Sequence, residues 1–256
     1  MDYSKIGWTD HTWNPWQGCE HVSPACKFCY IGPIMKRAGR VPFDGPNRAK
    51  TTWKKPFRWQ RNAQTEGHRF RVFTCSLSDF FHPDADQWRD EAWEVIRKCP
   101  NLDFMVLTKR PELMAERMPA DWGDGYSNVW LGVTVENENY LDRIDLVTEI
   151  PAPVHFVSAE PLFGPIDFRP KLDRIDWLIT GCERAAKDKR RTMDMDWVRD
   201  LSSQCVEAKT AFFFKQYYEG SQLQFNGVLD GKVRHAWPLP TKPLHRRRRK
   251  PGIYRV

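Results

Sequence analysis

The sequence predicts an α/β fold, a partial or closed (β/α) barrel of about six to seven βα units. Two observations lead to this prediction. From residue 70 onward, short apolar runs alternate with segments of helical periodicity, and each apolar run is followed by polar residues. A chain of 256 residues is long enough for one domain of this kind. A flat, doubly wound parallel sheet is the alternative architecture.

The predicted strands are short and rich in β-branched or aromatic residues, as expected for strands buried on both faces. A first strand is expected near the N-terminus. The later runs cover residues 70–77, 104–107, 129–135, 154–157, 177–180 and 211–214. Amphipathic segments between them predict helices over residues 86–99, 111–118, 139–149 and 194–208.

Polar side chains follow all of these runs, and functional sites of β/α barrels lie at the carboxyl ends of the strands. We therefore expect one shared polar site at this rim. Its candidate residues are Ser76, Ser78, Asp79, Thr108, Lys109, Arg110, Thr134, Glu136, Ser158, Glu160, Cys182, Glu183, Lys215 and Gln216. Helix capping is the alternative role for Asp79 and Ser158. For Lys109, Arg110 and Lys215, an ion pair with a rim carboxylate is the alternative to a grip on a substrate carboxylate or phosphate.

Three cysteines, Cys19, Cys26 and Cys29, lie close together near the N-terminus, and the next cysteine is Cys75. Three thiolates on one loop can hold a metal centre and leave one coordination position open, as catalysis requires. A structural zinc site completed by a nearby histidine, His11 or His21, is the alternative. The chain has seven cysteines and no sequence typical of a secretory signal, which predicts reduced thiols in the cytoplasm. No apolar run is long enough to predict a membrane span.

The net charge of +7 is concentrated in two blocks. Residues 36–71 contain eleven Lys or Arg and two acids, and residues 245–256 contain six Lys or Arg and no acid. Such blocks point to a polyanionic partner. In residues 32–69 cations alternate with aromatic residues, which suits a single-stranded nucleic acid, whereas the alternative is a helix that buries its aromatics. The basic tail suits non-specific phosphate contact or serves only solubility.

Sequence motifs in a fixed order extend the prediction. They are NPWxGC and SPxCKFCY within residues 14–30, SLSDFFH at 76–82, LTKRP at 107–111, VWLGVTVEN at 129–137, SAEPL at 158–162 and FFFKQ at 212–216. In this order they resemble the three-Cys-motif proteins of phages and prophages, which are relatives of the radical S-adenosylmethionine (SAM) enzymes. The resemblance covers about residues 6–240. It implies a radical-SAM-like barrel domain over residues 1–244, with a cluster loop at 13–30, a basic insertion at 32–69 and a basic tail at 245–256.

The resemblance also implies a chemistry. Cys19, Cys26 and Cys29 would hold a [4Fe–4S] cluster whose fourth iron chelates SAM, and one electron would release a 5′-deoxyadenosyl radical that takes a hydrogen atom from the substrate. The electron donor would be a flavodoxin or ferredoxin. The residues implied to contact SAM are Phe28 at the adenine, Ser76, Ser78 and Asp79 toward the methionine, and Thr134, Glu136, Ser158 and Glu160 toward the ribose and sulfonium. Tyr30 and Thr108 are further SAM-binding candidates.

Further roles follow from the same rim. Lys109, Glu160, Cys182 and Lys215 are the catalytic candidates, with Cys182 as a radical relay or hydrogen donor, or simply as a packed thiol. The substrate-binding candidates are Trp13, Asn14, Trp16, Arg110, Glu183 and Gln216, with shielding of the cluster as the other role of the two tryptophans. The expected substrate is a base in DNA, such as a modified thymidine of a phage genome, in the host cytoplasm. A peptide or small molecule is the alternative, and so is a non-catalytic zinc module for nucleic acid.

The sequence departs from the common patterns at three places. Residues 181–185 read GCERA where many relatives have a Gly-Gly-Glu-Ser-Gly segment, which is expected to alter the substrate side. Six residues separate Cys19 from Cys26, where most radical SAM enzymes have three. The segment SLSD at residues 76–79 stands where a Gly-Gly-Glu segment is usual. The loop geometry and the methionine contacts are therefore expected to be specific to this chain.

Overall fold

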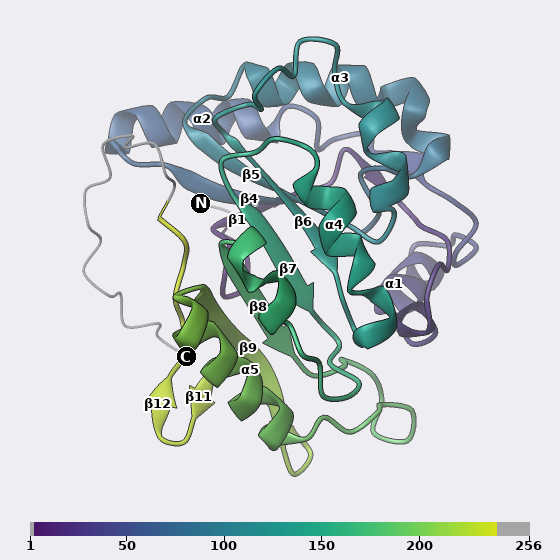
Figure 1. Cartoon of the computed structure of the whole chain (residues 1–256). Helices are drawn as coiled ribbons and strands as arrows, with labels where there is room; N and C mark the ends of the chain where they lie inside the picture. Colours follow the sequence, from purple (N-terminus) through teal and green to yellow (C-terminus); the bar gives the residue numbers. More distant parts are fainter. Residues whose placement is uncertain (1–2, 240–256) are drawn as a thin grey trace.

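The fold is built on one large sheet, seen in a computed structural model that describes residues 3–239 (Figure 1). The strand order is β1-β4-β5-β6-β7-β8-β9-β10. All neighbouring strands from β1 to β9 are parallel, and β10 is antiparallel to β9. Because β1 and β10 are the two edges and do not pair, the sheet is a curled half-barrel and not a closed barrel.

Seven strands of the sheet, β1 and β4 to β9, correspond to predicted ones, whereas the edge strand β10 was not predicted. The structure has β1 (His11–Trp13), β4 (Phe70–Thr74), β5 (Leu102–Thr108), β6 (Val129–Thr134), β7 (His155–Ala159), β8 (Trp177–Gly181), β9 (Ala211–Glu219) and β10 (Gln222–Gln224). Two small antiparallel pairs lie outside it, β2 (Trp16–Gln17) with β3 (Asn47–Arg48) and β11 (Val228–Leu229) with β12 (Lys232–Val233). The prediction of buried, mainly parallel strands is confirmed.

The helices agree less completely with the prediction. The α-helices are α1 (Ile31–Arg37), α2 (Lys55–Glu66), α3 (Asp86–Arg97), α4 (Asp142–Thr148) and α5 (Met195–Ala208). The helix predicted over residues 111–118 is wrong, since that segment forms two 3₁₀ turns, Pro111–Leu113 and Ala115–Arg117. Met118 is extended ahead of Pro119, as sterics before a proline favour, so the segment is too short for an α-helix.

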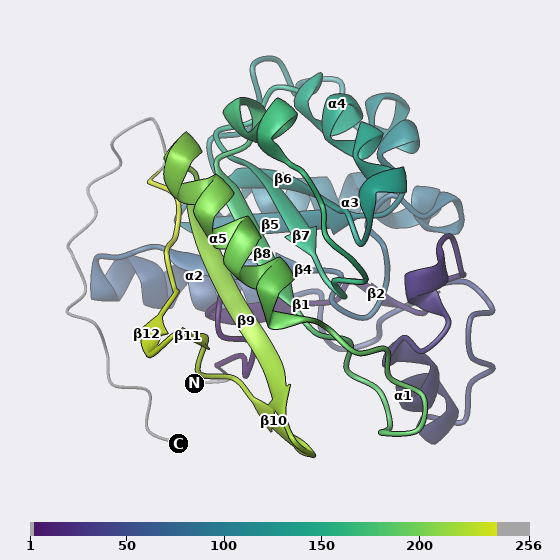
Figure 2. The ribbon, with the colours of Figure 1, turned by 60° about the horizontal axis from the view of Figure 1, so that its bottom comes forward.

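Successive side chains along the strands point to opposite faces of the sheet and form two hydrophobic cores. On β5, Phe104 and Val106 pack into the larger cluster, which contains the buried faces of α2, α3, α4 and α5. Met105 lies on the opposite face, in a second cluster with Trp8 and Trp130. This two-residue period is that of a strand buried on both faces. Figures 1 and 2 show α2, α3, α4 and α5 on one face of the sheet, so the second cluster fills the other, inner face of the half-barrel.

The chain termini complete the inner face. Trp237 Nε1 donates to the Trp8 carbonyl at 3.2 Å, and Trp177 Nε1 donates to the Ala236 carbonyl at 2.8 Å. Gly132 lies against the Phe156 ring, which a Cβ at this position would approach to 2.5 Å. The amino-end half of the inner face is therefore a closed aromatic layer, above which the strand ends remain open.

The basic segment 32–69 contributes to the core. It forms α1, β3 and α2, and it buries Trp53 (7% exposed) and Trp59 (2% exposed) in the larger cluster. These two rings are not available to stack on bases, so the packed-helix interpretation is confirmed for them. The basic tail 245–256 lies outside the described residues.

Candidate functional site

A cavity of about 1350 Å³ lies at the carboxyl ends of the parallel strands. Trp8, Phe73 and Leu107, which belong to the aromatic inner layer, form its floor. Most of the predicted site residues line it, namely Asn14, Cys19, Cys26, Phe28, Cys29, Tyr30, Ser76, Ser78, Asp79, Thr108, Lys109, Arg110, Thr134, Ser158, Glu160, Cys182, Glu183, Lys215 and Gln216. Ligand cavities usually measure about 300–1000 Å³, so this one has room for two small molecules.

The cysteine loop forms one wall of this cavity. Its entry requires Gly18, whose φ is +110° and whose Cβ would stand 2.2 Å from the Gly45 carbonyl oxygen. Cys26 is buried, while Cys19 and Cys29 are partly buried, and all three line the cavity. Burial raises the pKa of Cys19 to about 12 and also raises that of Cys29. The thiols are thus held in a place where thiolates need a compensating positive charge.

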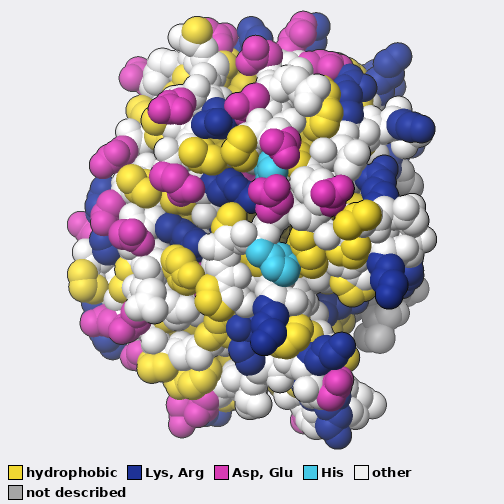
Figure 3. Space-filling view, turned by 90° about the vertical axis from the view of Figure 1, so that its right-hand side faces the viewer, with side chains coloured by type: hydrophobic (Ala, Val, Ile, Leu, Met, Phe, Trp, Pro, Cys, Tyr) yellow, Lys and Arg dark blue, Asp and Glu magenta, His cyan; other side chains and the backbone are white. Residues whose placement is uncertain are grey.

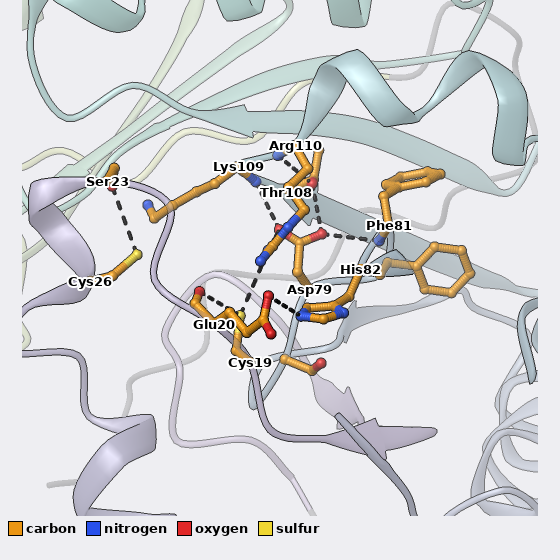
Figure 4. Close-up of polar contacts among 12 residues, drawn as sticks. Cys19, Glu20, Ser23, Cys26, Asp79, Phe81, His82, Thr108, Lys109 and Arg110 are labelled. Atoms are coloured by element: carbon orange, nitrogen blue, oxygen red, sulfur yellow. Dashed lines mark hydrogen bonds and ion pairs between the residues drawn. The ribbon is translucent and has the colours of Figure 1, made fainter. Parts of the chain in front are cut away.

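Each cysteine sulfur has a polar neighbour, and Figure 4 shows those of Cys19 and Cys26. Arg110 Nη1 lies 3.8 Å from Cys19 Sγ, and Ser23 Oγ lies 3.8 Å from Cys26 Sγ. The backbone at Ile31, the first residue of α1, hydrogen-bonds Cys29, and this bond and the charge of Lys109 offset part of the rise that burial causes in the pKa of that thiol. The strand end after β5 therefore delivers two cations to the cysteine loop, although residues 19 and 110 are far apart in the sequence.

Asp79 holds this strand end in place. Its Oδ1 accepts from Thr108 Oγ1 at 2.7 Å and from the Phe81 amide at 3.0 Å. Its Oδ2 accepts from the Lys109 amide at 3.0 Å and from Arg110 Nη1 at 3.3 Å. With four donors, a 5% exposed carboxylate is fully satisfied. Asp79 thus orients residues 108–110 and has no acceptor capacity in reserve for a ligand.

A second network joins the cysteine loop to the end of β4. Asn14 Nδ2 donates to Ser76 Oγ at 3.0 Å, and Asn14 Oδ1 accepts from the Leu77 amide at 2.8 Å. Ser78 Oγ donates to the Gly18 carbonyl at 2.6 Å, and the Tyr30 hydroxyl donates to the Ser76 carbonyl. These residues line the cavity, and their hydrogen bonds fix the cysteine loop against the sheet.

On the opposite side of the rim, the polar side chains have fewer of their hydrogen-bonding positions filled. Lys215 Nζ lies 3.1 Å from Glu160 Oε2, which also accepts from Ser158 Oγ at 3.3 Å. Glu160 Oε1 is buried and, within residues 3–239, has no hydrogen-bond partner. It lies over Gly181, where a Cβ would stand 2.6 Å away. A carboxylate oxygen without a donor is costly, so Glu160 is the rim group best prepared to accept a hydrogen bond from a ligand.

Residues after β8 close the same side. Burial raises the pKa of the Cys182 thiol to about 12, with the Glu160 charge adding to the shift, so this thiol is protonated at neutral pH. The Glu183 carboxylate is occupied by Arg191, whose Nη1 and Nη2 donate to the Pro24 carbonyl at 3.2 Å. Gln216 Nε2 donates to the Cys182 carbonyl at 3.0 Å.

Arg191 was not a predicted site residue. It lies 3.7 Å from the Phe163 ring and 5.5 Å from the Phe28 ring, and so it ties the loop between β8 and α5 to the cysteine loop. Figure 2 shows these two segments side by side at the same end of the molecule. The basic run 187–191 marked the segment in the sequence, but nothing there indicated its contact with Pro24.

Three predicted site residues do not line the cavity. Trp13 is fully buried against Trp53 and Phe104, and Trp16 packs on Phe80 with its indole N–H donating to the Asp79 carbonyl at 3.0 Å. The prediction that these tryptophans bind substrate is wrong, because their strands turn both rings into the core.

Glu136 is the third residue. It is fully buried and pairs with Arg143 Nη1 at 3.1 Å, with Lys109 Nζ at 3.9 Å. The prediction that it contacts SAM at the cavity wall is wrong, since it lies behind Lys109 and outside the cavity lining. Its neighbour Thr134 does line the cavity.

The alternative of zinc completed by a histidine does not match the geometry. His11 is buried on the ring of Trp59 at 4.4 Å, and His21 lies 3.9 Å from the Phe43 ring. Within residues 3–239, the one group of three Cys, His, Asp or Glu ligand atoms lying within 4.8 Å of one another is Glu20, His82 and Asp84, and it contains no cysteine. His82 Nδ1 there already accepts from the Asp84 amide at 3.2 Å.

The outer surface beside this site is mixed in charge. Figure 3, which views the side that carries α1, shows acidic side chains around one histidine and a group of Lys and Arg side chains below another. No helix within residues 3–239 combines the length and hydropathy needed to cross a bilayer.

Comparison with known proteins gives one match. The family model DUF5131, described as a protein of unknown function, matches residues 3–247. No curated protein and no solved structure matches the chain. Since the matched segment includes the cysteine loop and all the strand ends of the cavity, the chain belongs to the DUF5131 family.

Proposed function

We propose that this protein is a radical SAM enzyme with a radical-SAM-like half-barrel, in which Cys19, Cys26 and Cys29 hold a [4Fe–4S] cluster and SAM binds beside it. One observation carries the proposal. The three cysteines line the same cavity as the polar ends of β4, β5, β6, β7, β8 and β9. A three-thiolate centre with an open position is useful for catalysis where a second ligand can reach it.

The donor set suits an iron–sulfur cluster. Soft thiolate ligands favour iron–sulfur clusters or zinc. A single tetrahedral zinc, with Zn–S bonds of about 2.3 Å, needs its sulfurs about 3.8 Å apart. The three Sγ atoms are not all within 4.8 Å of one another, whereas a cluster holds its thiolates on separate irons and therefore farther apart.

The bound cofactors would supply one-electron chemistry, in which SAM takes up one electron and yields methionine while 5′-deoxyadenosine forms with a hydrogen atom from the substrate. The chain's own residues would orient the reactants. Glu160, whose Oε1 has no hydrogen-bond partner within residues 3–239, would accept a ligand hydroxyl or offset a sulfonium charge. Phe28 offers a partly exposed ring next to Cys29 for a base. The aromatic floor excludes water from below.

The substrate we propose is a base in nucleic acid, and DNA is the preferred form. Support comes from the mouth of the cavity, where the exposed rings Tyr30 (41%) and Phe225 (51%) lie among its lining residues. Lys5 and Arg184, both exposed, line the same mouth, and Arg184 lies 6.0 Å from the Phe225 ring. Rings for bases and cations for phosphates are the features of single-strand recognition, and a base to be modified must leave its stack.

A peptide or free small molecule is the second candidate substrate. It is favoured by the acidic side chains next to the cysteine loop, among them Glu20 and Asp84, which are exposed and would repel a phosphate backbone. Binding of a single-stranded oligonucleotide that weakens steeply with salt would decide for nucleic acid, and salt-independent or absent binding would decide against it.

The activity is tested with protein purified without oxygen. Iron and sulfide are measured, a low-potential reductant and SAM are added, and 5′-deoxyadenosine is quantified. We expect about four irons per chain and reductant-dependent 5′-deoxyadenosine. A colourless zinc protein that leaves SAM intact would overturn the proposal in favour of a metal-binding module.

A further inference from the structure

Arg110 occupies an unusual position for a rim cation. Its side chain is 5% exposed, although it lines the cavity. Nη1 lies 3.3 Å from Asp79 Oδ2 and 3.8 Å from Cys19 Sγ, so the guanidinium stands between a carboxylate and a cysteine (Figure 4). A guanidinium is always charged, and its planar fork can donate to two acceptors at once.

Asp79 prevents this guanidinium from turning toward a substrate. The carboxylate also accepts from the amides of Phe81 and Lys109 and from the Thr108 hydroxyl, which fixes it to both strand ends. The Arg110 amide in turn donates to Thr108 Oγ1 at 2.9 Å. Backbone and side chain of Arg110 are therefore both anchored, and the prediction that Arg110 grips substrate is replaced by another role.

The three cysteines differ in what faces them. Cys26 has a neutral hydroxyl, that of Ser23, and Cys29 has a backbone group at the start of α1. Lys109 acts on Cys29 by its charge, but its Nζ is shared with Glu136 at 3.9 Å. Cys19 alone among the three has a buried guanidinium within hydrogen-bonding distance.

We infer that Arg110 is a positioning residue whose fixed positive charge faces the Cys19 ligand, offsets the negative charge of its partner Asp79 there, and so keeps the reduction potential of the proposed cluster above the value it would have without the guanidinium. This inference rests on the proposed function. Reduction adds one electron to the cluster, and a cation a few ångströms from a ligand sulfur stabilises the more negative state, most strongly where water is excluded. Because only Cys19 among the three ligands faces this guanidinium, we expect the effect on the reduction potential to act through Cys19 and not through the whole cysteine loop.

The test measures the midpoint potential of the cluster by an anaerobic redox titration followed by electron paramagnetic resonance. Replacing Arg110 by Met removes the charge and keeps a long side chain. We expect the equilibrium with a one-electron reductant to shift at least tenfold toward the oxidised cluster, which corresponds to a potential 59 mV lower. Arg110→Lys keeps the charge but loses the fork, and we expect a shift in the same direction of less than tenfold.

Arg69→Met is the matched control. Arg69 Nη2 lies 2.8 Å from Asp103 Oδ1, and the Arg69 side chain is 10% exposed. This ion pair also joins β4 to β5, but at the amino ends of these strands. We expect Arg69→Met to lose stability without a shift in potential.

Equal potentials in wild type and Arg110→Met, or an equal shift in Arg69→Met, would overturn the inference. Should Arg110→Met fail to retain iron, Arg110→Gln, which also removes the charge but keeps a hydrogen-bond donor, takes its place, and an unshifted potential in that variant would overturn the inference. If wild-type protein contains no iron and sulfide, the proposed function is overturned together with this inference. If wild-type protein contains iron and cleaves SAM but the midpoint potential of Arg110→Met is unshifted, this inference alone is refuted.

Discussion

The β4–β5 pair carries a buried Asp–Arg ion pair at each end, and the two pairs differ in what the arginine does with its remaining donors. At the amino ends, Arg69 holds Asp103 at 2.8 Å and gives its other N–H groups to the carbonyls of Pro100 and Leu102. At the carboxyl ends, Arg110 holds Asp79 at 3.3 Å and faces the sulfur of Cys19.

The comparison separates a structural ion pair from one with a further role. Both join the same two strands, and both are shielded from water. Breaking a buried pair from one side leaves an uncompensated charge and costs about 3–5 kcal/mol wherever it lies. The pair at the carboxyl ends lines the cavity described above, whereas neither Arg69 nor Asp103 does, because parallel strands present all their carboxyl ends on one side.

The largest expected effect comes from the cysteine loop itself. Cys26→Ala should reduce bound iron from about four atoms per chain to almost none, because one thiolate of three is lost. Iron and sulfide analysis after anaerobic purification measures this. Cys205→Ala, a buried cysteine of α5 outside the cavity, should keep its iron and lose about 1 kcal/mol of stability. Full iron content in Cys26→Ala would show that the ligand set is wrong.

The two aspartates test the comparison directly. Asp79→Ala and Asp103→Ala each leave a buried arginine without its carboxylate, and each should lower the free energy of unfolding by about 3–5 kcal/mol. Urea denaturation of the metal-free proteins under reducing conditions checks this. Only Asp79→Ala should also reduce iron retention, since residues 108–110 lose their anchor. Equal iron retention in the two variants would mean that the carboxyl-end pair is merely structural.

Glu160 allows a comparison with Asp79, since both are rim carboxylates but only that of Asp79 has hydrogen bonds to both oxygens. Glu160→Gln removes the charge that faces Lys215 and should slow 5′-deoxyadenosine formation at least tenfold, which is about 1.4 kcal/mol in the barrier. Its effect on the unfolding free energy should stay below about 1 kcal/mol, the scale of a partly exposed ion pair. The control is Glu149→Gln, an exposed glutamate after α4. Unchanged turnover in Glu160→Gln would remove Glu160 from the proposed site.

The smallest expected effect is a pH dependence of folding stability that arises from His235, which does not line the cavity. Burial lowers the pKa of His235, although its Nε2 lies 3.1 Å from the Phe214 carbonyl oxygen. The unfolded chain then binds the proton more readily than the folded one, so stability is constant above about pH 7.5 and falls as the pH drops through about 6.5. Urea midpoints at about pH 8 and pH 5.5 measure the slope, which should be shallower in His235→Gln. An equal slope would assign the acid sensitivity to other groups.

Much of the architecture is predictable from local pattern. The six later strands and the helices α3 and α5 follow from apolar runs and amphipathic periodicity, which report burial one residue at a time. The segment 111–118 was not predictable in this way, because its helical pattern competes with Pro119, whose effect on the preceding residue ended the helix. Trp13 and Trp16 were misassigned for a related reason, since aromatic residues beside a cysteine loop have the same pattern whether they face a ligand or the core.

By itself, the sequence determined the order of strands and helices, the loop that carries three cysteines and the row of polar residues at the strand ends. These are local properties of composition and periodicity. The tertiary structure alone decided which of the polar residues remain open to a ligand. The register of β4 against β5 brings Asp79 and Arg110 together beside Cys19, whereas Glu136, which follows β6, pairs with Arg143 outside the cavity lining. Contacts between residues so far apart depend on strand register and side-chain direction, which no local pattern encodes.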